Sequence, residues 1–411
     1  MRTERLTATG APAETADRLR SLVPAPESVS DAVREIIAGV RAGGEDSLLE
    51  YTRRFDTPEP GPLVVDDDDI SRALEGLDAD VRAGLELSMD NVRRVAEAGV
   101  EQERKVSFPK HGVTMRSVPV KRAAVYVPGG RAPYPSTVLM GAVTARAAGV
   151  PEVVVCSPPP VDDAILAACG LVGVTRVYRM GGAQAIAALA YGTDQVEPVD
   201  VIVGPGNLYV QDAKLQVSGQ VGIDGFAGPS DLVVLADDSA DPELVALDLL
   251  AQAEHGEGTL VVAVSPSKAL LEALPLDAAP QTGATAVTVE VSDVGEGLAI
   301  AEAFAPEHLQ LVGPNAEALA PDVTRAGCLF VGAAAGTAFG DYVAGSNHIL
   351  PTGGAARFAS GLSPAHFRRR FAEVRIGDPD PLAAAAAPVA RAEGFELHAR
   401  SMEARIRDNG R

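Results

Sequence analysis

The chain has 411 residues, too many for one ordinary hydrophobic core, so we expect two larger domains with extensions. Hydrophobic residues make up 46% and charged residues 22%, which is typical of a globular protein, and the formal net charge of -21 argues against nucleic-acid or anionic membrane partners. Three widely spaced cysteines, no membrane span and no apolar signal core after Met1 predict a cytoplasmic protein.

The first part of the chain is predicted to be helical. Residues 1–25 read as an N-terminal extension that ends at Pro24 and Pro26. From residue 28 to about residue 104, apolar side chains recur at helical spacing, and Gly43-Gly44 stops the first stripe, which consists of Val33, Ile36, Ile37 and Val40.

From residue 122, predicted strands and helices alternate with glycine-containing loops between them. This pattern is typical of a parallel sheet covered on both faces. We expect Ser136 to cap one helix and Gly170 to end the next. The predicted strands are 123–127, 152–156, 175–180 and 199–203, and the predicted helices are 137–148, 164–169 and one from 181.

The second half of the chain repeats this pattern. Leu260–Pro266 resembles Val153–Pro158, and residues 299–315 resemble residues 185–207. Chance similarity among Ala- and Val-rich strands is the alternative. We predict an α/β protein with two related Rossmann-like, incompletely doubly wound parallel sheets, facing across a cleft at the carboxyl ends of their strands.

The predicted domain division follows from this repeat. Residues 26–122 and 232–361 form one discontinuous α/β domain, which holds the candidate catalytic residues. Residues 123–231 form the other α/β domain. The alternation stops after residue 361, so residues 362–411 are interpreted as a helical C-terminal arm.

Candidate metal ligands stand near the end of a predicted helix that begins at Pro242. Gln252 and His255 lie three residues apart on one helical face and can offer an amide oxygen and a ring nitrogen to one cation. The alternative is a C-terminal histidine favoured by the helix dipole. Asp341 and His348 share the glycine-rich stretch 340–351, which is predicted to be a loop, and there they could equally be hydrogen-bonded turn residues.

Two further stretches combine a carboxylate with an imidazole. Glu307-His308 stands directly before an apolar strand and supplies the two proton acceptors of a two-step oxidation, although a polar turn explains it equally well. Glu393 and His398 have the wrong spacing for one helical face, and a break at Gly394 would place Glu393 on a cap. An exposed tail histidine is the alternative there. The remaining histidines, His111 and His366, are expected on the surface.

Together, the motifs of this chain resemble those of the histidinol dehydrogenase family from about residue 28 to His398. No single motif is specific, but their combination is. They are Val125-Tyr-Val-Pro-Gly-Gly-Arg131, Tyr134-Pro-Ser136, Gly204-Pro-Gly-Asn207, Ala227-Gly-Pro-Ser-Asp231, Gln252-Ala-Glu-His255, Ala305-Pro-Glu-His-Leu309, Gly340-Asp-Tyr-Val-Ala-Gly-Ser-Asn-His-Ile-Leu-Pro351 and Glu393-Gly-Phe-Glu-Leu-His398.

The resemblance implies oxidation of L-histidinol to L-histidine through the aldehyde, in two NAD-dependent steps that end histidine biosynthesis. His308 would be the general base of the first step, and Glu307 would activate water in the second. A divalent metal, usually one zinc per subunit, would be held by Gln252, His255, Asp341 and His398. The last ligand would come from the partner subunit of a homodimer, through the C-terminal arm.

The family's remaining contacts carry over in the same way. Substrate contacts would be Ser230, His348 and Glu393, together with Glu307, His308 and the metal ligands Gln252, His255, Asp341 and His398. NAD contacts would be Tyr126, Gln184 and Asn207. The cofactor assignment comes from the resemblance alone, because no G-x-G-x-x-G motif follows a strand, although Gly181-Gly182 at a helix start could meet a pyrophosphate.

Three other interpretations remain open. A paralogue could oxidise another small amino or sulfo alcohol, as sulfopropanediol dehydrogenase does, but a sulfonate pocket should contain Arg or Lys. A zinc hydrolase could use Glu307 to activate metal-bound water. A non-catalytic binding protein is the third, and the intact Glu307-His308 pair argues against it.

Overall fold

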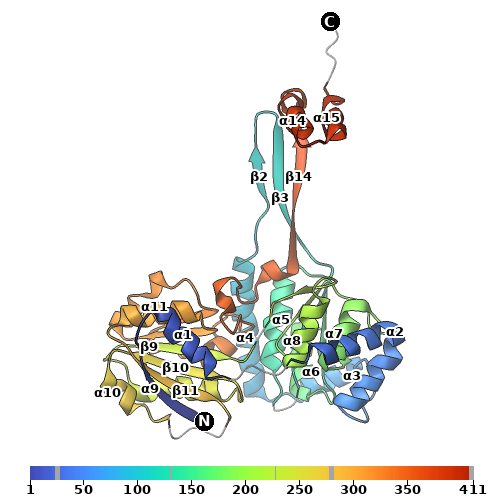
Figure 1. Ribbon diagram of the computed structural model, residues 1–411. Coiled ribbons are helices and arrows are strands. Elements are labelled where there is room, and N and C mark those ends of the chain that lie inside the picture. The colour runs from blue at the N-terminus through green and yellow to red at the C-terminus, as the bar shows by residue number, and fades with distance from the viewer. Residues whose placement is uncertain (24–27, 130–131, 227, 277–281, 407–411) are drawn as a thin grey trace. The chain divides into compact units, whose positions relative to one another are not determined.

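The computed structural model describes residues 1–23, 28–129, 132–226, 228–276 and 282–406. The chain forms two compact units, which we describe separately: Met1–Gly99 with Val120–Phe367, and Val100–Pro119 with Arg368–Arg411 (Figure 1). No helix in these described ranges is long and apolar enough to cross a membrane. Pro24, Pro26, Gly130, Arg131 and Ala227, which belong to the stretches quoted above, lie outside the described residues.

A five-stranded parallel sheet forms one lobe of the first unit, with the order β6-β5-β4-β7-β8. Its helices alternate with the strands, as the sequence predicts, and its central strands are buried. The elements are β4 (Arg122–Tyr126), α5 (Pro135–Ala147), β5 (Glu152–Ser157), α6 (Asp163–Val172), β6 (Val177–Arg179), α7 (Gly182–Tyr191), β7 (Val201–Val203), α8 (Leu208–Val217) and β8 (Gly222–Ile223).

A six-stranded parallel sheet forms the other lobe, with the order β1-β11-β10-β9-β12-β13. Its elements are β1 (Arg2–Thr7), α1 (Pro12–Ser21), β9 (Asp231–Ala236), α9 (Pro242–Ala253), β10 (Leu260–Ser265), α10 (Lys268–Ala273), β11 (Thr285–Glu290), α11 (Val294–Phe304), β12 (His308–Val312), α12 (Pro314–Glu317), β13 (Cys328–Val331) and α13 (Ala338–Tyr342). Among the described residues, 3-10 turns lie at Ala320–Asp322, Ala355–Arg357 and Pro364–Phe367.

The two sheets have the same topology. If the strands of each sheet are numbered from 1 to 5 along the chain and β1 is left aside, both orders read 3-2-1-4-5. The similar stretches of sequence therefore fall on equivalent strands: β5 and β10 are both second, and β7 and β12 are both fourth. The predicted fold class, two related Rossmann-like parallel sheets, is confirmed.

The structure divides the chain differently from the predicted domains. Residues 1–25 are more than an extension, because β1 pairs in parallel with β11, with Arg2 opposite Thr285, and α1 packs on α11. The helices of the 26–122 stretch pack on the five-stranded lobe, although they were assigned to the other domain. They are α2 (Ser30–Phe55), α3 (Asp67–Glu75) and α4 (Ala79–Ala98). An apolar stripe identifies a buried face but not the surface that covers it.

Several helix ends differ from the sequence prediction. α2 continues past Gly43-Gly44 with a kink at Gly44, where φ is 56° and ψ is -133°. α5 begins at Pro135, and no side chain, Ser136 included, caps it. α6 runs past Gly170 to Val172. A Cβ at Gly170 would lie 3.1 Å from the Leu74 side chain, so this glycine allows close packing of α6 on α3 rather than ending a helix.

The second unit combines a three-stranded antiparallel sheet, ordered β14-β3-β2, with two helices. Its elements are β2 (Arg104–Ser107), β3 (His111–Pro119), β14 (Arg368–Ile376), α14 (Asp380–Ala392) and α15 (Glu396–Glu403). The predicted helical arm of residues 362–411 therefore contains a strand, and it shares this sheet with residues from the 26–122 stretch. Gly394, at a φ of 82°, separates the two helices as predicted.

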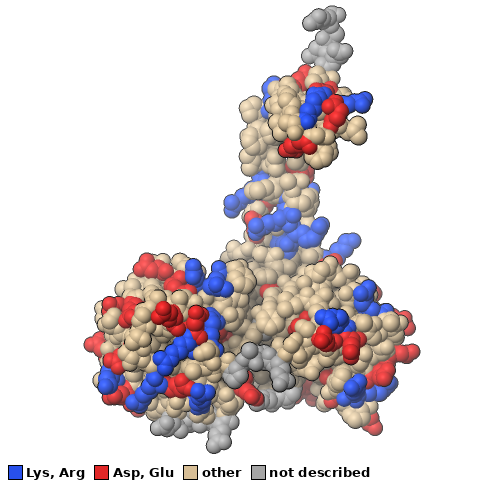
Figure 2. Space-filling view, viewed as in Figure 1, with Lys and Arg blue, Asp and Glu red and all other residues tan. Residues whose placement is uncertain are grey.

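Charged side chains are spread widely on the face of the first unit that Figure 2 shows. There, Lys and Arg alternate with Asp and Glu over both lobes. The net charge of -21 is thus distributed over the surface rather than gathered in one acidic patch on this face.

Candidate active site

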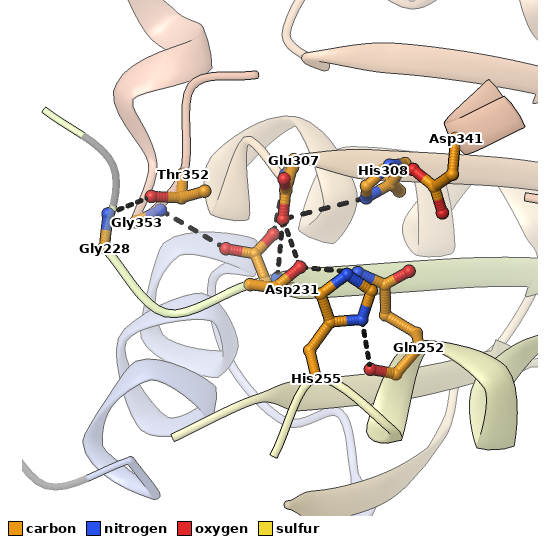
Figure 3. A network of polar contacts seen from close by, with 10 residues as sticks. Gly228, Asp231, Gln252, His255, Glu307, His308, Asp341, Thr352 and Gly353 are labelled. Carbon is orange, nitrogen blue, oxygen red and sulfur yellow. Dashed lines mark hydrogen bonds and ion pairs between the residues drawn. The ribbon is translucent and has the colours of Figure 1, made fainter. Parts of the chain in front are cut away.

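The candidate catalytic side chains lie at the amino ends of two neighbouring strands. β9 and β12 are parallel partners, with His308 opposite Leu232. Asp231 at the start of β9 therefore lies beside Glu307 and His308 at the start of β12 (Figure 3), and Ser230, just before β9, contacts Glu307. The expectation of a site at carboxyl ends is wrong for this sheet, because Glu307 directly precedes β12, His308 is its first residue, and the first residues of parallel strands share the amino edge.

The Glu307 carboxylate is buried and held by two hydrogen-bond donors at the start of β9. It accepts hydrogen bonds from the Ser230 hydroxyl and from the Asp231 backbone N–H, the latter at 3.2 Å. The Glu307 N–H in turn donates to Asp231 Oδ1 at 2.6 Å. Burial raises the pKa of Glu307 to about 7, and the Ser230 hydrogen bond opposes that shift. A carboxylate with this pKa can accept a proton at neutral pH.

The His308 ring lies between two carboxylates. Its Nδ1 is 3.7 Å from Glu307 Oε2, and its Nε2 is 3.9 Å from Asp341 Oδ1. Burial lowers the pKa of His308, which favours the neutral ring. Nδ1 is buried and has no hydrogen-bond partner among the described residues. If the ring takes up a proton, both nitrogens therefore have a carboxylate within 4 Å that stabilises the positive charge.

The three candidate metal ligands of this unit belong to the same network (Figure 3). Gln252, in the last turn of α9, donates from Nε2 to the Ser230 hydroxyl, which leaves its amide oxygen available. His255 follows α9, and its Nδ1 is 3.1 Å from the Gln252 carbonyl oxygen, so its exposed ring can offer Nε2. Asp341 lies in α13, which packs on α9, rather than in the predicted loop.

The donor atoms of this set fit a borderline divalent cation. An imidazole nitrogen, a carboxylate and an amide oxygen are donors that zinc and neighbouring metals accept. Within the described ranges, no cluster of three or more His, Cys, Asp or Glu side chains is placed to hold one metal ion. The set found here contains only two such side chains, because its third member is Gln252 and the fourth, His398, belongs to the second unit.

His348 links the 340–351 stretch to the helix α5. Its Nε2 is 3.2 Å from Thr137 Oγ1, and its Nδ1 is 3.1 Å from the Asp341 carbonyl oxygen. Burial lowers the pKa of His348 to about 4, so the ring is neutral. These contacts fix the segment that carries Asp341.

The three predicted NAD contacts line one cavity of about 1110 Å³ in the five-stranded lobe. Tyr126 ends β4, Gln184 lies in α7, and Asn207 caps α8 by accepting the Val210 N–H at 3.1 Å. The cavity lies at the carboxyl ends of β4, β5 and β7, where the strand order reverses, which is the usual place for a ligand in such a sheet. For this sheet, a cavity does lie at the predicted carboxyl edge, and the assignment of its ligand as NAD stays a prediction.

The start of α7 is already engaged by side chains. The Gly182 N–H donates to Tyr126 Oη at 3.1 Å, and Gln184 Nε2 donates to Asp56 Oδ2 at 3.1 Å. Burial raises the pKa of Asp56 to about 6, while its bonds to Gln184 and the Gly181 amide oppose the shift. Since these groups occupy the helix start, Gly181-Gly182 does not present its amides to a pyrophosphate as the sequence suggested.

The structure places the last two predicted site residues in the second unit. Glu393 is exposed and lies at the C-terminal cap of α14. His398 is exposed in α15, with its ring centroid 5.1 Å from that of Phe395. His111 differs from the expected surface histidine, because its ring stacks on Phe108 and its Nδ1 is buried without a partner among the described residues.

Sequence reasoning missed four charged residues around these sites: Asp56, Asp231, Lys214 and Asp224. Asp231 directly follows Ser230, so a carboxylate at the first residue of a buried strand was a usable signal. Asp56 follows a long helix, where an acidic residue gives no sign of burial. Lys214 follows the motif Gly204-Pro-Gly-Asn207 and Asp224 shortly precedes the motif Ala227-Gly-Pro-Ser-Asp231, but neither residue is part of a motif.

A family model described as histidinol dehydrogenase matches residues 23–406. The chain belongs to the histidinol dehydrogenase family. It is 42% identical over 400 residues to the histidinol dehydrogenase of Natronomonas pharaonis, across 92% of this chain and 94% of that one. The histidinol dehydrogenase of Pseudomonas aeruginosa is 40% identical over 404 residues, across 93% and 92% of the two chains.

The fold agrees with that membership. The crystal structure of histidinol dehydrogenase from Elizabethkingia anophelis matches with a TM-score of 0.90 at 29% sequence identity, and covers 98% of both chains. The chain therefore has the histidinol dehydrogenase fold over nearly its full length.

Proposed function

We propose that this protein oxidises L-histidinol to L-histidine through L-histidinaldehyde, in two NAD-dependent steps. The observation that carries the proposal is the adjacent buried pair Glu307-His308, in which burial raises the pKa of Glu307 to about 7 and lowers the pKa of His308, so that the ring is unprotonated and available as an acceptor. The family membership supplies the substrate. NAD, when bound, accepts one hydride in each step.

In the first step, His308 removes the hydroxyl proton while a hydride leaves the carbon that bears the hydroxyl group. This step gives the aldehyde. In the second step, Glu307 removes a proton from the water that attacks the aldehyde, and the hydrate then loses its hydride and a proton to give the carboxylate. Overall, one alcohol, one water and two NAD⁺ give one carboxylate, two NADH and three protons.

We infer that Gln252, His255 and Asp341 hold a divalent metal, zinc by family resemblance, together with His398 of the partner subunit. Bound there, the metal would orient the substrate and polarise its oxygen. The chain's own contribution is to fix the donors: Ser230 orients the Gln252 amide, and the Gln252 carbonyl oxygen orients the His255 ring.

A homodimer is supported by the surface of the second unit. Its buried cluster consists of only three alanines, Ala387, Ala390 and Ala399. Large apolar side chains are exposed along its strands and helices instead, and such surfaces mark interfaces. They are Val106, Phe108, Met115, Phe371, Val374, Ile376, Val389, Phe395, Leu397 and Ile406.

The charge of the site favours an amino alcohol over a sulfo alcohol. The residues labelled in Figure 3 include three carboxylates and no Lys or Arg. A cationic amine suits this surrounding, whereas a sulfonate would meet repulsion.

The deciding experiment is a spectrophotometric assay of NAD reduction with L-histidinol, L-histidinaldehyde and several amino and sulfo alcohols, with and without a chelator. We expect two NADH per histidinol, one per aldehyde, and loss of activity after metal removal. Preference for a sulfo alcohol would assign the protein to a paralogous activity, and substrate hydrolysis without NAD reduction would contradict the proposal.

A further inference from the structure

A buried ion pair holds the loop that follows β7 and leads to the cavity-lining residue Asn207. The Lys214 side chain on α8 is 1% exposed, and its Nζ forms an ion pair with the carboxylate of Asp224, whose side chain is 5% exposed. Lys214 Nζ also donates to the Gly204 carbonyl oxygen at 3.0 Å. Asp224 Oδ2 accepts the Gly204 backbone N–H at 2.7 Å. The pair therefore engages both backbone polar groups of one residue.

Gly204 is where the loop can least tolerate displacement. It has a φ of 119°, a conformation that L side chains rarely adopt. A Cβ there would lie 2.1 Å from the Tyr126 carbonyl oxygen, so the ends of β7 and β4 are in direct backbone contact. The cavity is lined by Tyr126 and Pro128 at the end of β4 and by Asn207 in the loop after β7.

The position of Gly204 determines that of Asn207 because the two residues are joined by a short segment. Asn207 lies three residues after Gly204 and caps α8. Lys214 lies further along the same helix, on the same face as Asn207. The segment 204–207 is thus held at its first residue by the ion pair and at its last residue by the helix. Lys214 and Asp224 are not among the residues that line the cavity, so they act on a ligand only through this segment.

Stability alone does not account for such a pair. Desolvation of two charges offsets most of their attraction, and replacement of a buried ion pair by apolar residues is often neutral for stability. What the ion pair supplies and an apolar pair does not is a donor and an acceptor of fixed position for the Gly204 peptide groups.

We propose that Lys214 and Asp224 are positioning residues for the dinucleotide, which set the place of Tyr126 and Asn207 in the cavity by fixing Gly204. This inference rests on the proposed function, since it takes the cavity ligand to be NAD. The proposal adds Lys214 and Asp224 to the residues that matter for cofactor binding. Neither residue takes part in the proposed catalytic chemistry, and neither contacts the cofactor itself.

The test uses the full-length, metal-loaded enzyme and three variants: Asp224→Asn, Lys214→Met, and the double variant Lys214→Met/Asp224→Leu. The measurements are NADH binding by fluorescence titration, the KM for NAD, the KM for histidinol, and the thermal unfolding midpoint. The double variant leaves no unpaired buried charge, so it keeps the test interpretable if the single variants fail to fold.

A matched control comes from the same sheet. Arg122 is a buried cation at the amino end of β4, paired with Glu152 and Glu197, and it does not line the cavity. We expect Arg122→Met to lower the unfolding midpoint and to leave the KM for NAD within about twofold.

The proposal expects each Lys214 or Asp224 variant, the double one included, to weaken NADH binding and raise the KM for NAD about tenfold or more, with the KM for histidinol within about twofold. Unchanged NADH affinity in the folded double variant would overturn it, as would equal increases in both KM values. Failure of the unaltered protein to bind NADH at all would instead contradict the proposed function.

Discussion

Glu307 and Asp231 each donate a backbone N–H to the carboxylate of the other, at 2.6 Å from Glu307 and at 3.2 Å from Asp231. Asp231 Oδ2 also accepts the Gly353 N–H at 3.3 Å. The reciprocal bonds tie the starts of β9 and β12 together and place two buried carboxyl groups side by side. Burial, and then the charge of Glu307, raise the pKa of Asp231 to about 7.

The stability of the protein should therefore depend on the protonation of Asp231. Between about pH 4, the ordinary pKa of an aspartate, and about pH 7, the folded chain retains this proton and the unfolded chain releases it. Stability consequently falls as pH rises through that window, by an amount on the order of a few kcal/mol. Urea unfolding of Asp231→Asn across this range should show a flatter profile than that of the wild type.

The exposed neighbour Asp238 provides the control for this measurement. Asp238→Asn should follow the wild-type pH profile. Parallel profiles for wild type and Asp231→Asn would show that Asp231 is already ionised at low pH, and the buried-proton interpretation would then be wrong.

The division of labour between His308 and Glu307 is testable with two substrates. We expect His308→Asn to slow histidinol oxidation by about a hundredfold or more, because asparagine cannot accept the hydroxyl proton that the proposal assigns to the His308 ring. Glu307→Gln keeps an acceptor for Ser230 but cannot take a proton from water, so it should affect aldehyde oxidation more than aldehyde formation. Single-turnover traces with histidinol and with histidinaldehyde measure the two steps separately, and equal losses on both substrates would refute the assignment.

The contact between Gly204 and Tyr126 predicts a strong effect of a single methyl group. Gly204→Ala places a Cβ against the Tyr126 carbonyl oxygen at a positive φ, so we expect destabilisation on the order of 3 kcal/mol together with weaker NADH binding. Gly219→Ala is the matched control, because a Cβ there meets nothing within 4 Å. Urea midpoints and NADH titrations of both variants make the comparison, and similar midpoints would contradict the prediction.

Sharing of the site across a dimer predicts complementation. His255→Ala and His398→Ala subunits should each be inactive alone. Random mixing should restore about a quarter of wild-type activity, because half of the dimers are mixed and each mixed dimer contains one intact site. If the mixture stays inactive while mixed dimers are detected by mass, His398 does not complete the partner's site.

Deletion of residues 390–411 tests the same ligand through metal content. We expect the purified, truncated protein to lose its bound metal, measured by elemental analysis after dialysis, since three ligands from one subunit hold zinc less tightly than four. A shortened chain that retains one metal per subunit would remove His398 from the metal site.

The sequence predicted the repeat and the parallel sheets because buried parallel strands appear as continuous apolar runs. The match of Leu260–Pro266 to Val153–Pro158 correctly placed β10 and β5 at equivalent positions. The match of residues 299–315 to residues 185–207 was also correct, because each stretch runs from a helix into the fourth strand of its sheet, β12 and β7. These patterns involve residues close together in the chain, so they can be recognised from the sequence alone.

What the sequence did not predict depends on long-range packing. Both sheets have the same strand order, yet the cavity lined by Tyr126, Gln184 and Asn207 lies at carboxyl ends and the Glu307-His308 pair at amino ends. The general rule that ligands bind at the carboxyl ends of α/β strands indicated the wrong edge for the Glu307-His308 pair. The position of this pair at the beginning of its predicted strand indicated the amino edge, which is correct. Asp231 and Lys214 were missed because a charged side chain in a sequence gives no sign of whether it is buried.

The parallel pairing of β1 with β11 has a consequence for how the protein is made. The five-stranded sheet is built from one continuous stretch, from β4 to β8, and can assemble while later residues are still being synthesised on the ribosome. The first strand to emerge, β1, has to wait for Thr285–Glu290 before it finds its partner. The sheet that carries Glu307 and His308 is therefore completed late in translation, and its open edge is where a nascent chain is most exposed to wrong pairing.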